Sequence, residues 1–125
     1  MEWLKSLQTL SDAFGVAGFE DEVRETIEQL ISPYVDEMRT DPLGNLIATR
    51  KGSANTTLML DAHMDEVGFI VKWIEDTGYL RFVPLGGWDT RILPSHRVEI
   101  LTRAGEKRTG VIGAAPPHIL TEEER

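Results

Sequence analysis

The sequence of 125 residues contains no cysteine. Disulfide-stabilised scaffolds and zinc sites with thiolate ligands are therefore excluded, and any metal ion must be held by His, Asp or Glu. Long apolar runs are also absent, since none approaches the roughly 20 residues that a membrane-spanning helix needs. The N-terminal segment MEWLKSLQTLSDAF has no continuous apolar core and is unlike a secretory signal. We expect a soluble, cytoplasmic protein.

Basic side chains are in the minority. The sequence has 13 Lys and Arg against 21 Asp and Glu, which gives a formal net charge of −8. An acidic surface repels the phosphates of nucleic acids and the headgroups of anionic membranes, so neither is an expected partner. The hydrophobic fraction of 41% and the charged fraction of 27% are ordinary for a globular domain.

Two amphipathic helices are predicted near the N-terminus. Apolar residues at helical spacing indicate a helix over residues 2–14 and a second that begins near Glu20. Pro33 is expected to stop the second helix. Gly15 and Gly18 lie between the two, where glycine allows a tight turn.

Three strands are predicted next. Two cover residues 34–40 and 46–50, with the turn sequence DPLGN between them. The third is Leu58–Ala62, a short apolar run interrupted only by Asp61, which predicts a strand buried on both faces inside a parallel sheet. Helices followed by such strands indicate an α/β sheet with helices packed on it.

The pattern after Glu66 changes to strands and turns. Strands are predicted over residues 67–74, 79–85, 97–102 and 107–112, and turns that contain glycine join them in pairs. Short strands at close spacing are typical of a small barrel or sandwich. The change of pattern therefore marks a candidate domain boundary.

A histidine and an aspartate follow the strand predicted at residues 58–62. Ligands gather outside the carboxyl ends of strands in open α/β sheets, so His63 and Asp65 are placed where chemistry is often done. Residues two apart in an extended segment point to the same side. A neutral imidazole binds zinc-like ions through one nitrogen, and a carboxylate on the other fixes its tautomer. The alternative is a hydrogen-bonded histidine beside a solvated acid, and H-x-D by itself does not separate the two.

Several longer segments resemble one family of enzymes. The segment AHMDEVGFIV, preceded by LML, is similar to the one that carries the first metal ligand in the dinuclear metallo-aminopeptidases of peptidase family forty-two. That family contains glutamyl and deblocking aminopeptidases and large tetrahedral peptidase particles. GVAGFEDEVR at residues 15–24, DPLGN at 41–45, RVEI near Arg97 and GVIGAAPPH at 110–118 also match its segments. The resemblance covers essentially the whole chain.

The resemblance implies a fold and its division into domains. Residues 1–67 are expected to be the N-terminal part of a catalytic three-layer α/β aminopeptidase domain. Residues 68–125 are expected to be the first strands of an inserted β-barrel-like domain. In the family that inserted domain mediates subunit pairing, so the resemblance also implies a homo-oligomer formed through the β-rich part.

The resemblance further implies the site. His63 matches a metal ligand of the family, and Asp65 matches a catalytic residue that orients this ligand. The complete site holds two divalent ions, with zinc or cobalt expected, and its substrate is a peptide. The other ligands and the general-base glutamate of the family lie beyond the position of Arg125. We therefore expect a truncated gene product, a proteolytic remnant or a recombinant fragment that is inactive by itself.

Two other functions compete with the peptidase. One is a non-enzymatic oligomerisation module, in which the β-rich half pairs subunits and His63 has no role. The other is a glycoside hydrolase, which needs two carboxyl groups about 5–9.5 Å apart on either side of a sugar. Asp65 and Glu66 are adjacent and are expected to point to opposite faces, so the sequence favours this function least.

The remaining histidines and two tryptophans are assigned structural positions. His96 is expected in a solvated turn, and His118 at a structural position or a subunit contact. Neither shares a strand end with His63, so neither is an expected metal ligand. Trp73 and Trp88 are expected in the core or at an interface of the β-rich part.

Overall fold

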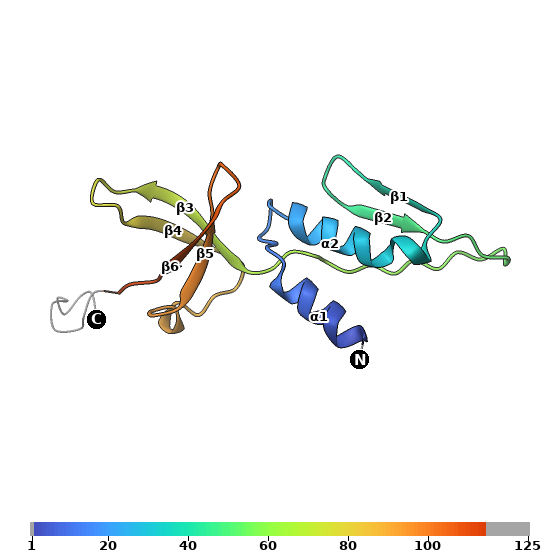
Figure 1. Cartoon of the computed structure of the whole chain (residues 1–125), viewed down its shortest axis with the longest axis horizontal. Coiled ribbons are helices and arrows are strands. Elements are labelled where there is room, and N and C mark those ends of the chain that lie inside the picture. Colours follow the sequence, from blue (N-terminus) through green and yellow to red (C-terminus); the bar gives the residue numbers. More distant parts are fainter. Residues whose placement is uncertain (1, 115–125) are drawn as a thin grey trace. The chain divides into compact units, whose positions relative to one another are not determined.

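The computed structural model describes residues 2–114 (Figure 1). They divide into two compact units, the first ending at Gly87 and the second beginning at Trp88. The first unit contains α1 (Glu2–Asp12), α2 (Asp21–Ile31), a 3-10 turn (Ser32–Tyr34), β1 (Glu37–Thr40), β2 (Leu46–Thr49), β3 (Gly68–Ile74) and β4 (Leu80–Leu85). The second contains a 3-10 turn (Thr90–Ile92), β5 (Arg97–Leu101) and β6 (Lys107–Val111). The mixed helix and strand content expected from the sequence is therefore present.

Both helices lie where the apolar spacing places them, with shorter ends. α1 stops at Asp12 rather than at residue 14. α2 stops at Ile31, just before the 3-10 turn that contains Pro33, because proline lacks the N–H that would continue an α-helix. The strand expected from residue 34 begins later, since Tyr34 belongs to that 3-10 turn.

The apolar core of the first unit is small. Its buried hydrophobic side chains among the described residues are Ala13, Val16 and Val23. A polar contact adds to it, because Arg24 Nη1 donates a hydrogen bond to Gly44 O at 3.1 Å and so ties α2 to the turn between β1 and β2. The N-terminal part of α2 is therefore held both by the packing of Val23 and by this hydrogen bond.

The DPLGN segment forms the turn between β1 and β2. One carboxylate oxygen of Asp41 accepts hydrogen bonds from the N–H groups of Leu43 and Asn45, at 2.9 and 3.0 Å. The other oxygen accepts from the Asn45 side-chain amide at 2.9 Å. Gly44 has a φ of 90°, a conformation that L side chains rarely adopt. The hydrogen bonds to Asp41, from the Asn45 side chain first, hold the pKa of Asp41 below its ordinary value.

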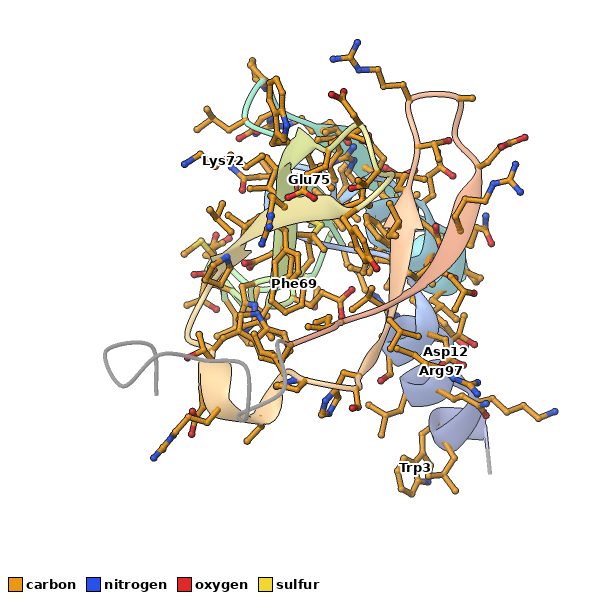
Figure 2. All side chains as sticks on the ribbon, turned by 90° about the vertical axis from the view of Figure 1, so that its left-hand side faces the viewer. Trp3, Asp12, Phe69, Lys72, Glu75 and Arg97 are labelled. Carbon is orange, nitrogen blue, oxygen red and sulfur yellow. The ribbon has the colours of Figure 1, made fainter. Side chains whose placement is uncertain are left out.

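The hairpin of β3 and β4 contains a bulge. The register shifts between Val71 and Trp73, which leaves Lys72 as the additional residue, and its side chain projects away from β3 (Figure 2). The rings of Phe69 and Phe82 meet edge to face with their centroids 4.8 Å apart. Trp73 is 66% exposed, so it is not a core residue of this unit, and its expected place at an interface stays a prediction.

The second unit is built on the hairpin of β5 and β6. Both strands expected here are present, each with five residues. Ser95 N–H donates to Ile112 O at 2.8 Å, and Ile112 N–H donates to His96 O at 2.9 Å, which extends the hydrogen bonding beyond the strands. Leu93 and Ile112 are its buried hydrophobic residues among those described.

The buried strand expected at Leu58–Ala62 is not formed. Leu58, Met59 and Leu60 are 84%, 82% and 88% exposed. The sheets formed by residues 2–114 are separate two-stranded antiparallel hairpins, and no strand in them pairs with this segment. A strand needs a neighbour to take its N–H and C=O groups, so an apolar run without one remains an extended, exposed chain. The described residues therefore do not form the parallel sheet expected from the sequence.

Some expectations concern features that the structure does not test. His118 lies outside the described residues. The domain boundary expected between residues 67 and 68 stays a prediction. Within residues 2–114, neither helix has the length and the apolar character needed to cross a membrane.

Replacing Asp41 by alanine is expected to lower the urea midpoint of unfolding, because the hydrogen bonds that close the turn lose their acceptor. The pKa of Asp41 is depressed below its ordinary 3.8, so its ionised form stabilises the fold above that pH. This contribution is lost as the pH falls through the folded-state pKa. Urea unfolding at a series of pH values should therefore show the difference between wild type and Asp41→Ala shrinking below pH 3.8.

The matched control is Asp76→Ala, in the turn between β3 and β4. It is expected to leave the midpoint close to that of the wild type at every pH. A difference between wild type and Asp41→Ala that stays constant from neutral to acid pH contradicts the assignment.

Candidate functional site

The extended segment of residues 57–67, which leads into β3, carries the candidate site residues His63 and Asp65. It reaches β3 without pairing as a strand, and at Glu66 it forms a parallel bridge to Val16 in the connection between α1 and α2. Glu66 N–H donates to Gly15 O at 2.7 Å, and a carboxylate oxygen of Glu66 accepts from Gly15 N–H at 3.2 Å. The residues just before Glu66 are thereby held against this connection.

His63 and Asp65 lie side by side. His63 Nδ1 is 3.0 Å from Asp65 O and 3.2 Å from an Asp65 carboxylate oxygen. A main-chain carbonyl can only accept a hydrogen bond, so Nδ1 carries the proton of the neutral imidazole. Nε2 is then left with the lone pair that a metal ion binds. The His63 side chain is 84% exposed and that of Asp65 is 45% exposed, which leaves this pair open to a ligand.

The donor set suits one ligand position of a metal centre. An imidazole whose other nitrogen is held by a carboxylate and a carbonyl is the arrangement typical of histidine ligands. No group of three or more His, Cys, Asp or Glu side chains within the described residues could hold a metal ion. Catalytic zinc sites usually take about three protein ligands. The described residues therefore fit one part of such a centre and not the whole.

A cavity of about 320 Å³ adjoins this segment in the first unit. Its lining comes from both helices, from their connection and from the chain before β3, namely Leu7, Leu10, Ser11, Ala13, Gly15, Val23, Met64, Asp65 and Glu66. Asp65 thus lines a largely apolar cavity while its carboxylate contacts the exposed ring of His63.

The structure adds one residue that sequence reasoning did not assign to the site. The sequence offers Glu66 only as the second carboxyl group of a glycoside hydrolase, whereas its carboxylate accepts a hydrogen bond from Gly15 N–H. The sequence carried no signal for this contact, because the two residues are 51 positions apart and a glycine does not say what approaches it. His96, by contrast, is exposed and follows the turn at residues 94–95, as expected.

A model of the M42 glutamyl aminopeptidase family matches residues 44–125 of the chain. The chain belongs to this family. The putative aminopeptidase FrvX of Escherichia coli (strain K12) is 43% identical over 122 residues, which cover 98% of this chain and 34% of FrvX. The resemblance found in the sequence motifs is therefore confirmed. The chain spans about a third of the length of the curated relatives that it matches.

Several solved structures share the fold of this chain over most of its length. A TET aminopeptidase from the marine sediment archaeon Thaumarchaeota archaeon SCGC AB-539-E09 matches with a TM-score of 0.88 and 40% identity, over 97% of this chain and 34% of that one. The TET1 peptidase of Pyrococcus horikoshii, which can assemble into a tetrahedron or a large octahedral shell, matches with a TM-score of 0.80 and 37% identity, over 95% and 35%. A Thermotoga maritima protein described as an endoglucanase matches with a TM-score of 0.76 and 46% identity, over 89% and 34%.

The tautomer of His63 can be measured directly. At a pH where the imidazole is neutral, ¹⁵N NMR of this chain is expected to show the ring proton on Nδ1 and a bare Nε2, because Asp65 supplies both acceptors. Asp65→Ala should increase the fraction protonated on Nε2, since only the carbonyl then remains. His96 in the same spectrum serves as the internal control. A wild-type His63 ring with its proton mainly on Nε2 contradicts the assignment.

Proposed function

We propose that this chain is the N-terminal part of a co-catalytic divalent-metal aminopeptidase, which releases N-terminal residues from peptides. The observation that carries the proposal is the hydrogen bonding of His63 Nδ1 to Asp65, which leaves Nε2 as an exposed lone pair. Membership of the M42 family supports the reaction class. The activity is proposed for a protein that carries this chain within the full length of its relatives, because the chain covers 34% of FrvX.

Each residue of the pair has a defined part. Asp65 accepts a hydrogen bond from Nδ1–H, which fixes the imidazole tautomer and leaves the Nε2 lone pair for an ion. His63 would hold one of two divalent ions, zinc or cobalt, through Nε2. Such a pair of ions would supply an activated water and Lewis-acid polarisation of the scissile carbonyl. The other ligands and the proton acceptor come from outside the described residues, which hold no ligand group of three.

The proposal includes a finer architecture. Residues 1–67 begin a three-layer α/β domain, and residues 68–125 hold the first strands of an inserted β-barrel-like domain. The exposed run Leu58–Leu60 supports the first part, because sheet neighbours on both sides would remove its apolar surface from water. The hairpins β3–β4 and β5–β6 support the second, since they supply the short antiparallel strands of which such domains are built.

A homo-oligomer formed through the β-rich part belongs to the same proposal. The TET1 peptidase of Pyrococcus horikoshii assembles into a tetrahedron or an octahedral shell. Exposed apolar residues gather on the β3–β4 hairpin of this chain, namely Ile70, Val71, Trp73, Ile74, Tyr79 and Val83. Apolar and aromatic side chains of this kind are typical of the centre of a subunit interface.

The competing functions have less support. The Thermotoga maritima relative is described as an endoglucanase, but glycoside hydrolysis needs two carboxyl groups that flank one bond. Here the Asp65 carboxylate contacts His63, whereas the Glu66 carboxylate accepts from Gly15 N–H. The two acids therefore serve different partners. A purely structural module would not need a histidine whose tautomer is fixed in an exposed position.

The test uses the protein of the relatives' length that carries this chain. With added zinc or cobalt it is expected to release the N-terminal residue of an aminoacyl p-nitroanilide, and a chelator is expected to stop the turnover. His63→Ala should abolish turnover, because the ion loses its ligand. Asp65→Asn should lower metal affinity or activity about 10–100-fold, the range found when the partner of a histidine ligand is changed.

His96→Ala is the matched control and should retain the wild-type turnover. Sizing chromatography of the same samples helps to distinguish the peptidase hypothesis from the hypothesis of a non-enzymatic oligomerisation module. A defined oligomer that takes up no metal and shows no turnover supports the module, and turnover that survives His63→Ala rules out the proposed ligand.

A further inference from the structure

Both the main chain and the side chain of Glu66 form hydrogen bonds to Gly15. Its N–H donates to Gly15 O at 2.7 Å, and its Oε1 accepts from Gly15 N–H at 3.2 Å. These two hydrogen bonds, with the parallel bridge between Val16 and Glu66, join two segments that are 51 residues apart in the sequence. Two bonds fix the rotation of the main chain at Glu66 as well as its position.

The partner of Glu66 is itself tightly held. A Cβ at Gly15 would lie 2.9 Å from Val23 Cγ1 and 3.4 Å from Met64 O. The connection between α1 and α2 therefore fits closely between α2 and the segment that carries His63 and Asp65. Phe14 N–H donates to a Glu22 carboxylate oxygen at 3.2 Å, which joins the connection to the first turn of α2. Glu66 is therefore attached to the small core of the unit and not to a freely moving loop.

The attachment at Glu66 sets the course of the chain at the candidate site. On one side, a Cβ at Gly68 would lie 2.6 Å from a Val16 methyl carbon, so the start of β3 also packs against the connection. On the other side, residues 57–65 form no main-chain hydrogen bond to another segment in the described part of the chain. Among the described residues, the main-chain hydrogen bond at Glu66 is therefore the one that ties the chain next to His63 and Asp65 to another segment.

We propose that Glu66 is a positioning residue for the metal site, a role that rests on the proposed function of His63. Its carboxylate fixes the main chain directly after Asp65. This keeps the carbonyl and the carboxylate of Asp65 within reach of His63 Nδ1 and so directs Nε2 toward the ion. Glu66 touches neither the ion nor the peptide in this role, and it acts through the main chain alone.

Four variants separate this role from a loss of fold. Glu66→Ala removes the acceptor for Gly15 N–H, and Glu66→Asp is one methylene too short to reach it and disturbs the packing less. Glu66→Gln keeps an oxygen in the same place and is the rescue variant. Glu20→Ala is the matched control, because Glu20 Oε1 accepts from Gly18 N–H at 2.8 Å in the same connection without joining it to the site segment.

The first readout is ¹⁵N NMR of this chain. Glu66→Ala and Glu66→Asp are expected to speed the amide exchange of Gly15 and to increase the Nε2-protonated fraction of His63. Glu66→Gln and Glu20→Ala should leave the His63 ring as in the wild type. A general loss of stability would not single out the proton position on this ring. An unchanged His63 spectrum in Glu66→Asp overturns the proposal.

The second readout is the cobalt(II) affinity of the protein of the relatives' length, measured by titration calorimetry. Glu66→Ala is expected to weaken cobalt binding about 10–100-fold, as for other residues that support a ligand, and Glu66→Gln is expected to restore it. Equal cobalt affinity in wild type and Glu66→Ala overturns the positioning role alone. A wild-type protein that binds no cobalt overturns the proposed function, and the positioning role with it.

Discussion

The pair of hydrogen bonds between Gly15 and Glu66 is the contact on which the arrangement of the first unit depends. It joins the connection between the helices to the chain that enters β3. The buried hydrophobic residues around it are few among those described, namely Ala13, Val16 and Val23. A typical hydrogen bond contributes about 0.5–1.5 kcal/mol net, and a buried methylene contributes about 0.8 kcal/mol. In so small a core, polar contacts of this kind weigh as much as the apolar packing.

Elements whose hydrogen-bond partners are close in sequence could be predicted from the residues. Both helices follow from the apolar spacing, because a helix satisfies its main chain internally. The turn between β1 and β2 follows from DPLGN, since Asp41 binds groups no more than four residues away and Gly44 supplies the positive φ. The hairpins of β3–β4 and β5–β6 follow in the same way, with Gly78 and Gly105 at positive φ in their turns.

Elements that depend on distant partners could not be predicted. The run at Leu58–Ala62 has the composition of a buried strand, yet composition does not supply the neighbouring strands, and within residues 2–114 none pairs with it. The hydrogen bonds between Glu66 and Gly15 could not be predicted for the same reason, because the two residues are 51 positions apart in the sequence. A Cβ at Gly15 would lie 2.9 Å from a Val23 methyl carbon in the structure, but a glycine in a sequence does not say what approaches it.

The pairing of His63 with Asp65 was predictable although the strand that was to present it is absent. An extended chain suffices to place residues two apart on one side, whether or not the chain pairs as a strand. Which imidazole nitrogen carries the proton was not predictable, because it depends on the Asp65 carbonyl 3.0 Å from Nδ1. That contact also gives the two residues different roles in the proposed site, with Asp65 at Nδ1 and a ligand at Nε2. An ion held by Nε2 would be on the other side of the ring from the Asp65 oxygens near Nδ1, so Asp65 would orient the ligand.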